Sequence, residues 1–259
     1  MTSGMCVRCG GRIIALQKET VAREKGRQLS DQMSYPVIYR MLKGIVVCGV
    51  CLDALPLIGH DICQRCGRDR KWQASIGSEG LCRDCVHGED GQILVANRSL
   101  LRYEKGEKDL LGLFKYRGDE RLASYYGTLL AVTVQRYYRS MGFTCITTVP
   151  LHPQRLRERG FNQVDLLARH LGAAIKIPVR SLLRRTKDTP KLSKQRGRVS
   201  RQESMREAFA WGEQSIPSAS TVLLIDDIYT TGATLRSCAR TIREHLGPSC
   251  EIYSLTIYR

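Results

Sequence analysis

The chain has 259 residues and is 42% hydrophobic, which gives it enough apolar surface to bury a sizeable core. Its 41 Lys and Arg residues outnumber its 25 Asp and Glu residues, and the formal net charge of +16 favours a polyanionic partner such as nucleic acid. The N-terminus lacks the apolar segment of a secretory signal, and no stretch approaches the roughly 18 uninterrupted apolar residues of a membrane span, so we expect a soluble cytoplasmic protein.

The first part of the chain carries four Cys-x-x-Cys pairs, in which two thiolates on a tight turn can bind one tetrahedral ion. A redox dithiol needs only one such pair, so the repetition favours metal, with iron–sulfur as the minor alternative to structural zinc. We predict two four-cysteine zinc sites, formed by Cys6 and Cys9 with Cys48 and Cys51, and by Cys63 and Cys66 with Cys82 and Cys85. An interleaved pairing of the same cysteines stays open.

We place a domain boundary after residue 92, because the cysteine pairs end there and an alternation of helices and strands begins. Residues 1–92 are predicted to form a small double zinc-ribbon-like domain, and residues 93–259 a larger α/β domain. Inside the first domain, Tyr35 to Tyr39 is compatible with a strand.

The second domain is predicted to contain a parallel sheet flanked by helices. Apolar residues recur at helical spacing in three of its segments, and continuous apolar runs indicate at least four strands. The expected helices are 109–116, 121–138 and 163–171, and the expected strands are 145–150, 179–183, 222–225 and 252–257.

Two basic segments follow strands of this predicted sheet. Arg155, Arg157 and Arg159 come after the strand that ends at Pro150, and they can bind either a pyrophosphate or DNA. The second segment carries Pro190 and no apolar periodicity, so we expect a loop that either closes over a ligand or binds single-stranded nucleic acid. Its candidate nucleic-acid residues are Arg184, Arg185, Lys191, Lys194, Arg196, Arg198 and Arg201.

The run from Val222 to Thr234 contains the most specific motif of the chain. Four apolar residues predict a buried strand, and open α/β sheets bind ligands at the carboxyl ends of such strands. There Asp226 and Asp227 can accept hydrogen bonds from sugar hydroxyls, and they are also the candidate catalytic residues. The following turn offers hydroxyls and backbone N–H groups to a phosphate, through Thr230, Thr231, Gly232, Ala233 and Thr234. A Walker-type ATPase is disfavoured, because the sequence contains no Gly-Lys dipeptide.

This motif resembles the phosphoribosyl-pyrophosphate motif of type I phosphoribosyltransferases. Together with the cysteine pairs, the segment from Lys115 to Asp119 and the segment from Arg159 to Gln163, it makes the whole chain similar to the ComF (ComFC) family of bacterial competence proteins. The resemblance implies a phosphoribosyltransferase-like domain that takes phosphoribosyl pyrophosphate with Mg²⁺. It also implies single-stranded DNA binding during natural transformation, and contact with the competence DNA-translocating ATPase and the recombination mediator.

Two hypotheses of different class follow. The first is a phosphoribosyltransferase whose acceptor the sequence does not identify, acting in competence or in the salvage of a nucleobase or amine. The second is a catalytically inactive scaffold that binds DNA. We favour a competence protein that has both a donor site and a DNA-binding surface.

Overall fold

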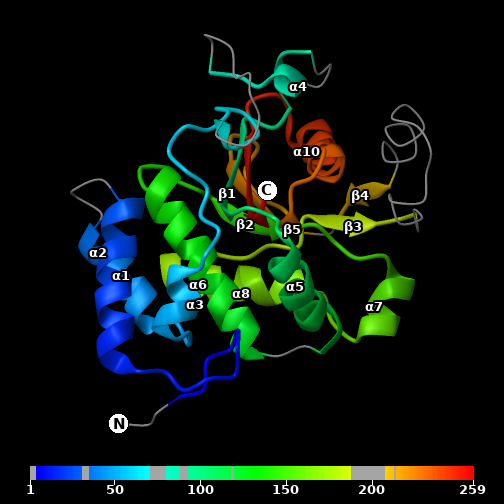
Figure 1. Cartoon of the computed structure of the whole chain (residues 1–259). Coiled ribbons are helices and arrows are strands. Elements are labelled where there is room, and N and C mark those ends of the chain that lie inside the picture. Colours follow the sequence, from blue (N-terminus) through cyan, green and yellow to red (C-terminus); the bar gives the residue numbers. More distant parts are fainter. Residues whose placement is uncertain are drawn as a thin grey trace.

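The computed structural model describes residues 4–30, 35–70, 80–87, 93–117, 120–187, 208–212 and 214–259. A parallel four-stranded sheet lies in the centre of the molecule (Figure 1). Its strands follow the order β1-β6-β5-β2. Its strands are β1 (Ala96–Leu101), β2 (Cys145–Thr148), β5 (Thr221–Ile228) and β6 (Glu251–Tyr258). A second, antiparallel pair consists of β3 (Leu183–Arg185) and β4 (Phe209–Trp211).

Helices cover both faces of the sheet, because alternate side chains of a strand point to opposite faces. Leu223 and Ile225 of β5 pack in the apolar cluster that contains α6 (Glu120–Tyr137) and α8 (Gln163–Ile175). Val222 and Leu224 pack in a second cluster with α10 (Ala233–Leu246). The predicted α/β fold with a helix-flanked parallel sheet is therefore confirmed, including the helices expected at 121–138 and 163–171.

The described residues of the N-terminal part form four helices: α1 (Ala15–Leu29), α2 (Tyr35–Gly44), α3 (Gly49–Asp53) and α4 (Arg83–Val86). The strand considered at 35–39 is wrong, because Ile38 and Leu42 are both fully buried one helical turn apart on α2. These two residues belong to the same apolar cluster as Leu129 of α6 and Leu255 of β6. Residues on both sides of the expected boundary at 92 therefore share one core.

Two further elements differ from the expectations. The strand expected at 179–183 is displaced: Ile146 bonds to the backbone of Pro178 and Arg180, and a regular strand begins only at Leu183, where it pairs with β4. Strand β1 was not predicted, because the buried Asn97 and Ser99 interrupt its apolar pattern. Helix α5 (Lys105–Arg117) extends the helix expected at 109–116, and α7 (Pro153–Arg159) carries the first basic segment. None of the helices in the described ranges has the length and hydrophobicity that a transmembrane helix requires.

Candidate functional site

The two predicted aspartates lie at the carboxyl end of β5, at the edge where parallel sheets bind ligands. Asp227 is 8% exposed, and its backbone N–H donates to Oδ1 of Asp226 at 2.8 Å. This bond holds the Asp226 carboxylate beside the chain, so the two acidic side chains occupy fixed and different positions.

Asp227 of β5 is bound by two side chains that come from helices α5 and α8. Neither side chain was predicted to contact it. Lys115 of α5 places Nζ 2.6 Å from Oδ2 of Asp227, and Gln163 at the start of α8 donates Nε2 to the same oxygen at 3.0 Å. A buried carboxylate requires such partners, because removing its charge from water costs roughly several kcal/mol, which only a counter-charge and hydrogen bonds can offset. The ion pair and the hydrogen bond therefore fix α5 and α8 relative to the end of β5.

Asp226 has a strongly perturbed acidity. Burial and, to a smaller extent, the negative charge of Asp227 raise its pKa to about 7, after the backbone N–H of Asp227 and the charges of Lys115 and Arg185 have partly offset the rise. A carboxyl group with this pKa changes charge near neutral pH, a property that is common at functional sites. Arg185 of β3 thus acts electrostatically on the aspartate site.

The turn between β5 and α10 leads directly into the N-terminus of a helix, a position at which anions can bind. Gly232 adopts φ +76°, and a Cβ there would lie 2.2 Å from the hydroxyl of Tyr229, so the position requires glycine. Thr230 and Thr231 are exposed, and Thr231 Oγ1 accepts from the N–H of Ala233 at 3.4 Å. The N–H groups of Thr234 and Leu235 come next in the first turn of the 14-residue helix α10, where the helix offers no carbonyl to them and a phosphate can bind.

The three arginines predicted to bind pyrophosphate lie on helix α7. Arg157 is exposed, whereas Arg155 and Arg159 are half-buried and lie one helical turn apart. Arg159 donates to Oε1 of Gln163 at 3.3 Å, and Gln163 in turn donates to Asp227. One of the three predicted arginines is therefore connected to the aspartate site through a single side chain.

The second basic segment is described only in part. Arg184 and Arg185 lie on β3, where Arg184 donates to the carbonyl of Trp211 at 3.3 Å and Arg185 stacks over Phe209 at 5.4 Å. The other predicted nucleic-acid residues, Lys191, Lys194, Arg196, Arg198 and Arg201, lie outside the described residues.

The eight paired cysteines form two clusters, in the sequence-adjacent pairing: Cys6, Cys9, Cys48 and Cys51, and Cys63, Cys66, Cys82 and Cys85. Within each cluster the sulfur atoms all lie within 4.8 Å of one another. The Sγ atoms of Cys9 and Cys48 are 3.8 Å apart, and those of Cys66 and Cys82 are 3.6 Å apart. A tetrahedral zinc ion with Zn–S bonds of about 2.3 Å requires sulfur separations of about 3.8 Å. Both clusters can therefore hold zinc.

Each cluster is built from the same two local structures. One pair lies in a turn closed by a glycine at positive φ, Gly10 in the first cluster and Gly67 in the second. The other pair lies at a helix start, where Cys48 precedes α3 and Cys82 precedes α4. Four thiolates fill the coordination shell of zinc, so these sites suit a structural role.

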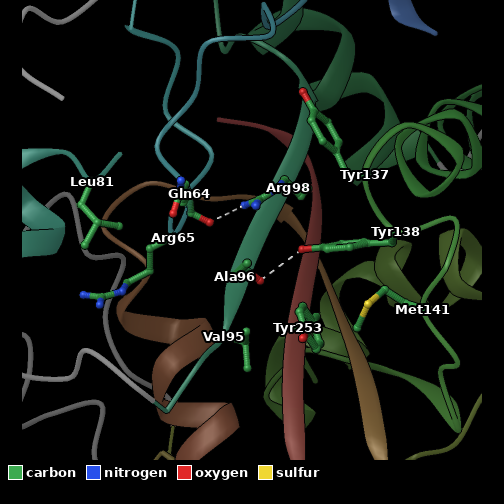
Figure 2. A pocket seen from close by; sticks show the side chains of 10 residues that line it. All are labelled: Gln64, Arg65, Leu81, Val95, Ala96, Arg98, Tyr137, Tyr138, Met141 and Tyr253. Atoms are coloured by element: carbon green, nitrogen blue, oxygen red, sulfur yellow. Dashed lines mark hydrogen bonds between the residues drawn. The ribbon is translucent and has the colours of Figure 1, made fainter. Parts of the chain in front are cut away.

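A groove of about 570 Å³ lies between the second cysteine cluster and the end of α6 (Figure 2). Arg98 of β1 donates to the carbonyls of Gln64 and Asn97, both at 2.8 Å, and lies 5.7 Å from the ring of Tyr137. Arg65 donates to the carbonyl of Cys85 at 2.5 Å. The hydrogen-bond acceptors of both guanidinium groups are uncharged backbone carbonyls. Among the described residues, no carboxylate forms an ion pair with Arg65 or Arg98. The groove therefore combines positive charge with tyrosine rings.

Curated relatives cover most of the chain, whereas no protein-family model matches it. The chain is 30% identical over 236 residues to the competence protein ComFC of Bacillus subtilis, covering 90% of this chain and 92% of that protein. It is 28% identical to ComFC of Streptococcus pneumoniae, with 81% and 86% covered, and 26% identical to the DNA utilization protein YhgH of Escherichia coli, with 82% and 98% covered. At this identity and coverage, the chain belongs to the ComFC family of competence proteins.

Proposed function

We propose that this protein acts in competence and binds phosphoribosyl pyrophosphate with Mg²⁺ at the carboxyl end of β5. The observation that carries the proposal is the adjacency of two carboxylates to an open helix start with exposed threonine hydroxyls. In this assignment Asp226 and Asp227 accept hydrogen bonds from the ribose hydroxyls, and residues 230–234 bind the 5′-phosphate. The names of the relatives support the role in competence.

The basic residues around the aspartates support the binding of the pyrophosphate group. Arg159 reaches the site through Gln163, and Arg185 is close enough to influence the acidity of Asp226. Guanidinium groups bind phosphate oxygens through paired N–H donors, and Mg²⁺ commonly bridges phosphates with few protein ligands. The same charges would stabilise a departing pyrophosphate if the donor is turned over.

Calorimetric titration of phosphoribosyl pyrophosphate with Mg²⁺ tests the donor site. We expect saturable binding by the zinc-loaded wild type and its loss in the Asp226→Asn/Asp227→Asn double variant, which removes both negative charges with little change in volume. Ribose 5-phosphate and pyrophosphate, titrated separately, should bind more weakly than the intact donor. Absence of binding by folded wild type would leave the DNA-binding scaffold as the better account.

We further propose that the protein binds single-stranded DNA, and that the groove of Figure 2 is one surface for it. Proteins that bind single strands combine positive charge along the backbone with aromatic rings that stack on bases. Arg65 and Arg98 supply the charge, while Tyr137 and Tyr253 are half-buried rings in the same groove. Binding by the segment 184–201, and contacts with the competence ATPase and the recombination mediator, stay predictions from the sequence.

Fluorescence anisotropy with a labelled oligothymidylate, repeated over a series of salt concentrations, separates these surfaces. Each phosphate contact contributes about −0.7 to the slope of log affinity against log salt for a single strand. We expect Arg98→Gln and Arg65→Gln each to make the slope shallower by about this amount. Arg169→Gln, an exposed arginine on α8, is the matched control. An effect of Arg196→Ala/Arg198→Ala alone would assign the DNA to the second basic segment instead.

A further inference from the structure

One arginine binds the start of the phosphate turn, which is the segment of residues 230–234 to which we assign the 5′-phosphate. Nη1 of Arg259 donates to the carbonyl oxygens of Tyr229 at 3.3 Å and Thr230 at 3.0 Å. The same guanidinium lies 4.7 Å from the centre of the Tyr229 ring, which is 5% exposed. Because Thr230 is the first residue of the phosphate turn and Tyr229 precedes it, the position of Arg259 fixes the start of this turn.

The other side of this guanidinium contacts the second cysteine cluster. Nε of Arg259 donates to the carbonyl of Cys66 at 3.1 Å, and Nη2 lies 3.4 Å from the sulfur of the same residue. A guanidinium is planar and holds its five N–H groups in a fixed arrangement. The metal-ligand turn and the phosphate turn are therefore joined through one rigid group.

Both the arginine and the cluster are held against the sheet. The backbone N–H of Arg259 donates to Leu101 at 3.0 Å, and that of Asn97 donates to Arg65 at 2.7 Å. A Cβ on Gly67 would lie 2.8 Å from the carbonyl oxygen of Asn97, so the turn after Cys66 packs directly on β1. A shift of Cys66 thus cannot be absorbed by free space, and it would be transmitted to Arg259.

Metal occupancy changes what Cys66 offers to this arginine. A thiolate bound to zinc keeps its position and part of its negative charge, and charge-assisted hydrogen bonds are roughly twice as strong as neutral ones. Without a metal ion, four sulfur atoms this close together lose the bond that holds them. The contact from Arg259 to the cluster therefore depends on the metal, whereas its contacts to Tyr229 and Thr230 do not involve a cysteine.

We infer that Arg259 is a positioning residue that couples metal occupancy of the second cysteine cluster to the affinity of the phosphate turn for its ligand. This inference rests on the donor site proposed above. Coupling between two binding sites is reciprocal. Donor binding must therefore raise the affinity of the second cluster for its metal ion by the same factor by which the metal ion raises the affinity for the donor. The second cluster is then part of the ligand-binding apparatus as well as a structural element.

Competition for zinc with a chromogenic chelator at equilibrium, with and without phosphoribosyl pyrophosphate and Mg²⁺, tests this coupling in the wild type. With two clusters we expect two steps of zinc loss, and the donor should raise the zinc affinity in one of them by about 10-fold, within the usual range of coupling between sites. Arg259→Ala should keep two zinc ions per chain, bind the donor about 10-fold more weakly by calorimetry, and show no donor-dependent gain in zinc affinity. Arg259→Lys should recover part of the donor affinity but not the gain in zinc affinity, because one ammonium group cannot contact both turns.

Arg169→Ala, on the exposed face of α8, is the control and should change neither quantity. Donor binding by the wild type without any gain in zinc affinity would overturn the inference and leave the proposed donor site intact. An equal gain in zinc affinity in the wild type and in Arg259→Ala would also overturn it, because the link would then run through other residues. A zinc-loaded wild type that binds no donor would instead contradict the proposed function.

Discussion

Glu107 provides a strong test of how the first cysteine cluster is joined to the sheet. Its carboxylate accepts from Nη2 of Arg8 at 2.5 Å, from Nη1 of Arg8 at 3.1 Å and from the hydroxyl of Tyr258 at 2.7 Å. Arg8 lies between two cysteines of the first cluster, and it also donates to the hydroxyl of Tyr125 at 2.7 Å. The side chains of Glu107 and Arg8 are 4% and 14% exposed, so this ion pair is largely removed from water.

Glu107→Gln keeps the shape of the side chain but leaves the charge of Arg8 buried without a counter-charge. Breaking a buried ion pair in this way costs about 3–5 kcal/mol. Domains of this kind are stable by only about 5–15 kcal/mol, so we expect a large fall in the free energy of unfolding. For a chain of this size the thermal midpoint should fall by roughly 6–20 °C.

Urea unfolding of the zinc-loaded protein, followed by circular dichroism, measures this loss. Glu19→Gln is the matched control, because Glu19 pairs with Lys43 at 2.8 Å while both side chains are about half exposed, at 45% and 50%. An exposed pair contributes little, so this variant should unfold close to the wild type. The double variant Arg8→Met/Glu107→Gln should recover part of the stability, because no unpaired charge remains. Similar losses in Glu107→Gln and Glu19→Gln would refute the reasoning.

Four further outcomes are predictable from the same geometry. The pKa of Asp226 is raised above its value in the unfolded chain, so the unfolded state binds fewer protons than the folded state between about pH 4 and 7. The free energy of unfolding of the wild type should therefore fall as the pH rises through this range, relative to that of Asp226→Asn. Urea unfolding at several pH values measures this difference. Donor affinity should rise with pH through about 7 in the wild type, because Asp226 loses its proton there, and it should rise more than in Asp226→Asn. Parallel pH profiles of donor affinity in the two proteins would argue against a role for this carboxylate. Gly232→Ala places an alanine in a left-handed backbone conformation, at a cost of about 1–3 kcal/mol, and its Cβ overlaps the Tyr229 hydroxyl. Calorimetry should therefore show a loss of donor binding in this variant. Gly142→Ala, where a Cβ meets open space, should bind the donor normally. Removal of zinc should lower the midpoint of a single thermal unfolding transition of the whole chain, because Leu42 and Leu129 pack in one core. Two separate transitions would favour independent domains at 1–92 and 93–259.

The parts of the site that lie close together in the sequence could be predicted from it. Asp226, Asp227 and the following turn form one uninterrupted motif, and the repeated spacing of the cysteines indicated two four-ligand clusters. The partners of Asp227 could not be found in this way, because Lys115 and Gln163 approach it from helices that are distant in the chain. Lys115 and Gln163 were noticed only as family signatures, without a role.

Misplaced elements have a similar physical origin. The segment from Tyr35 has β-branched and aromatic residues that suit a strand, but burial of Ile38 and Leu42 against α1 and α6 favours a helix. Strand β1 is buried with Asn97 and Ser99 inside, where Asn97 accepts from Ser254 at 2.8 Å and Ser99 pairs with Thr256 at 2.6 Å. These tertiary contacts compensate the polar groups, and no local pattern indicates them.

A crystal structure of the zinc-loaded protein with phosphoribosyl pyrophosphate and Mg²⁺ tests the central claim most directly. The account predicts ribose hydroxyls within hydrogen-bonding distance of Asp226 and Asp227, and the 5′-phosphate on the backbone N–H groups of residues 230–234. A donor bound elsewhere, or one whose ribose contacts neither aspartate, would contradict it.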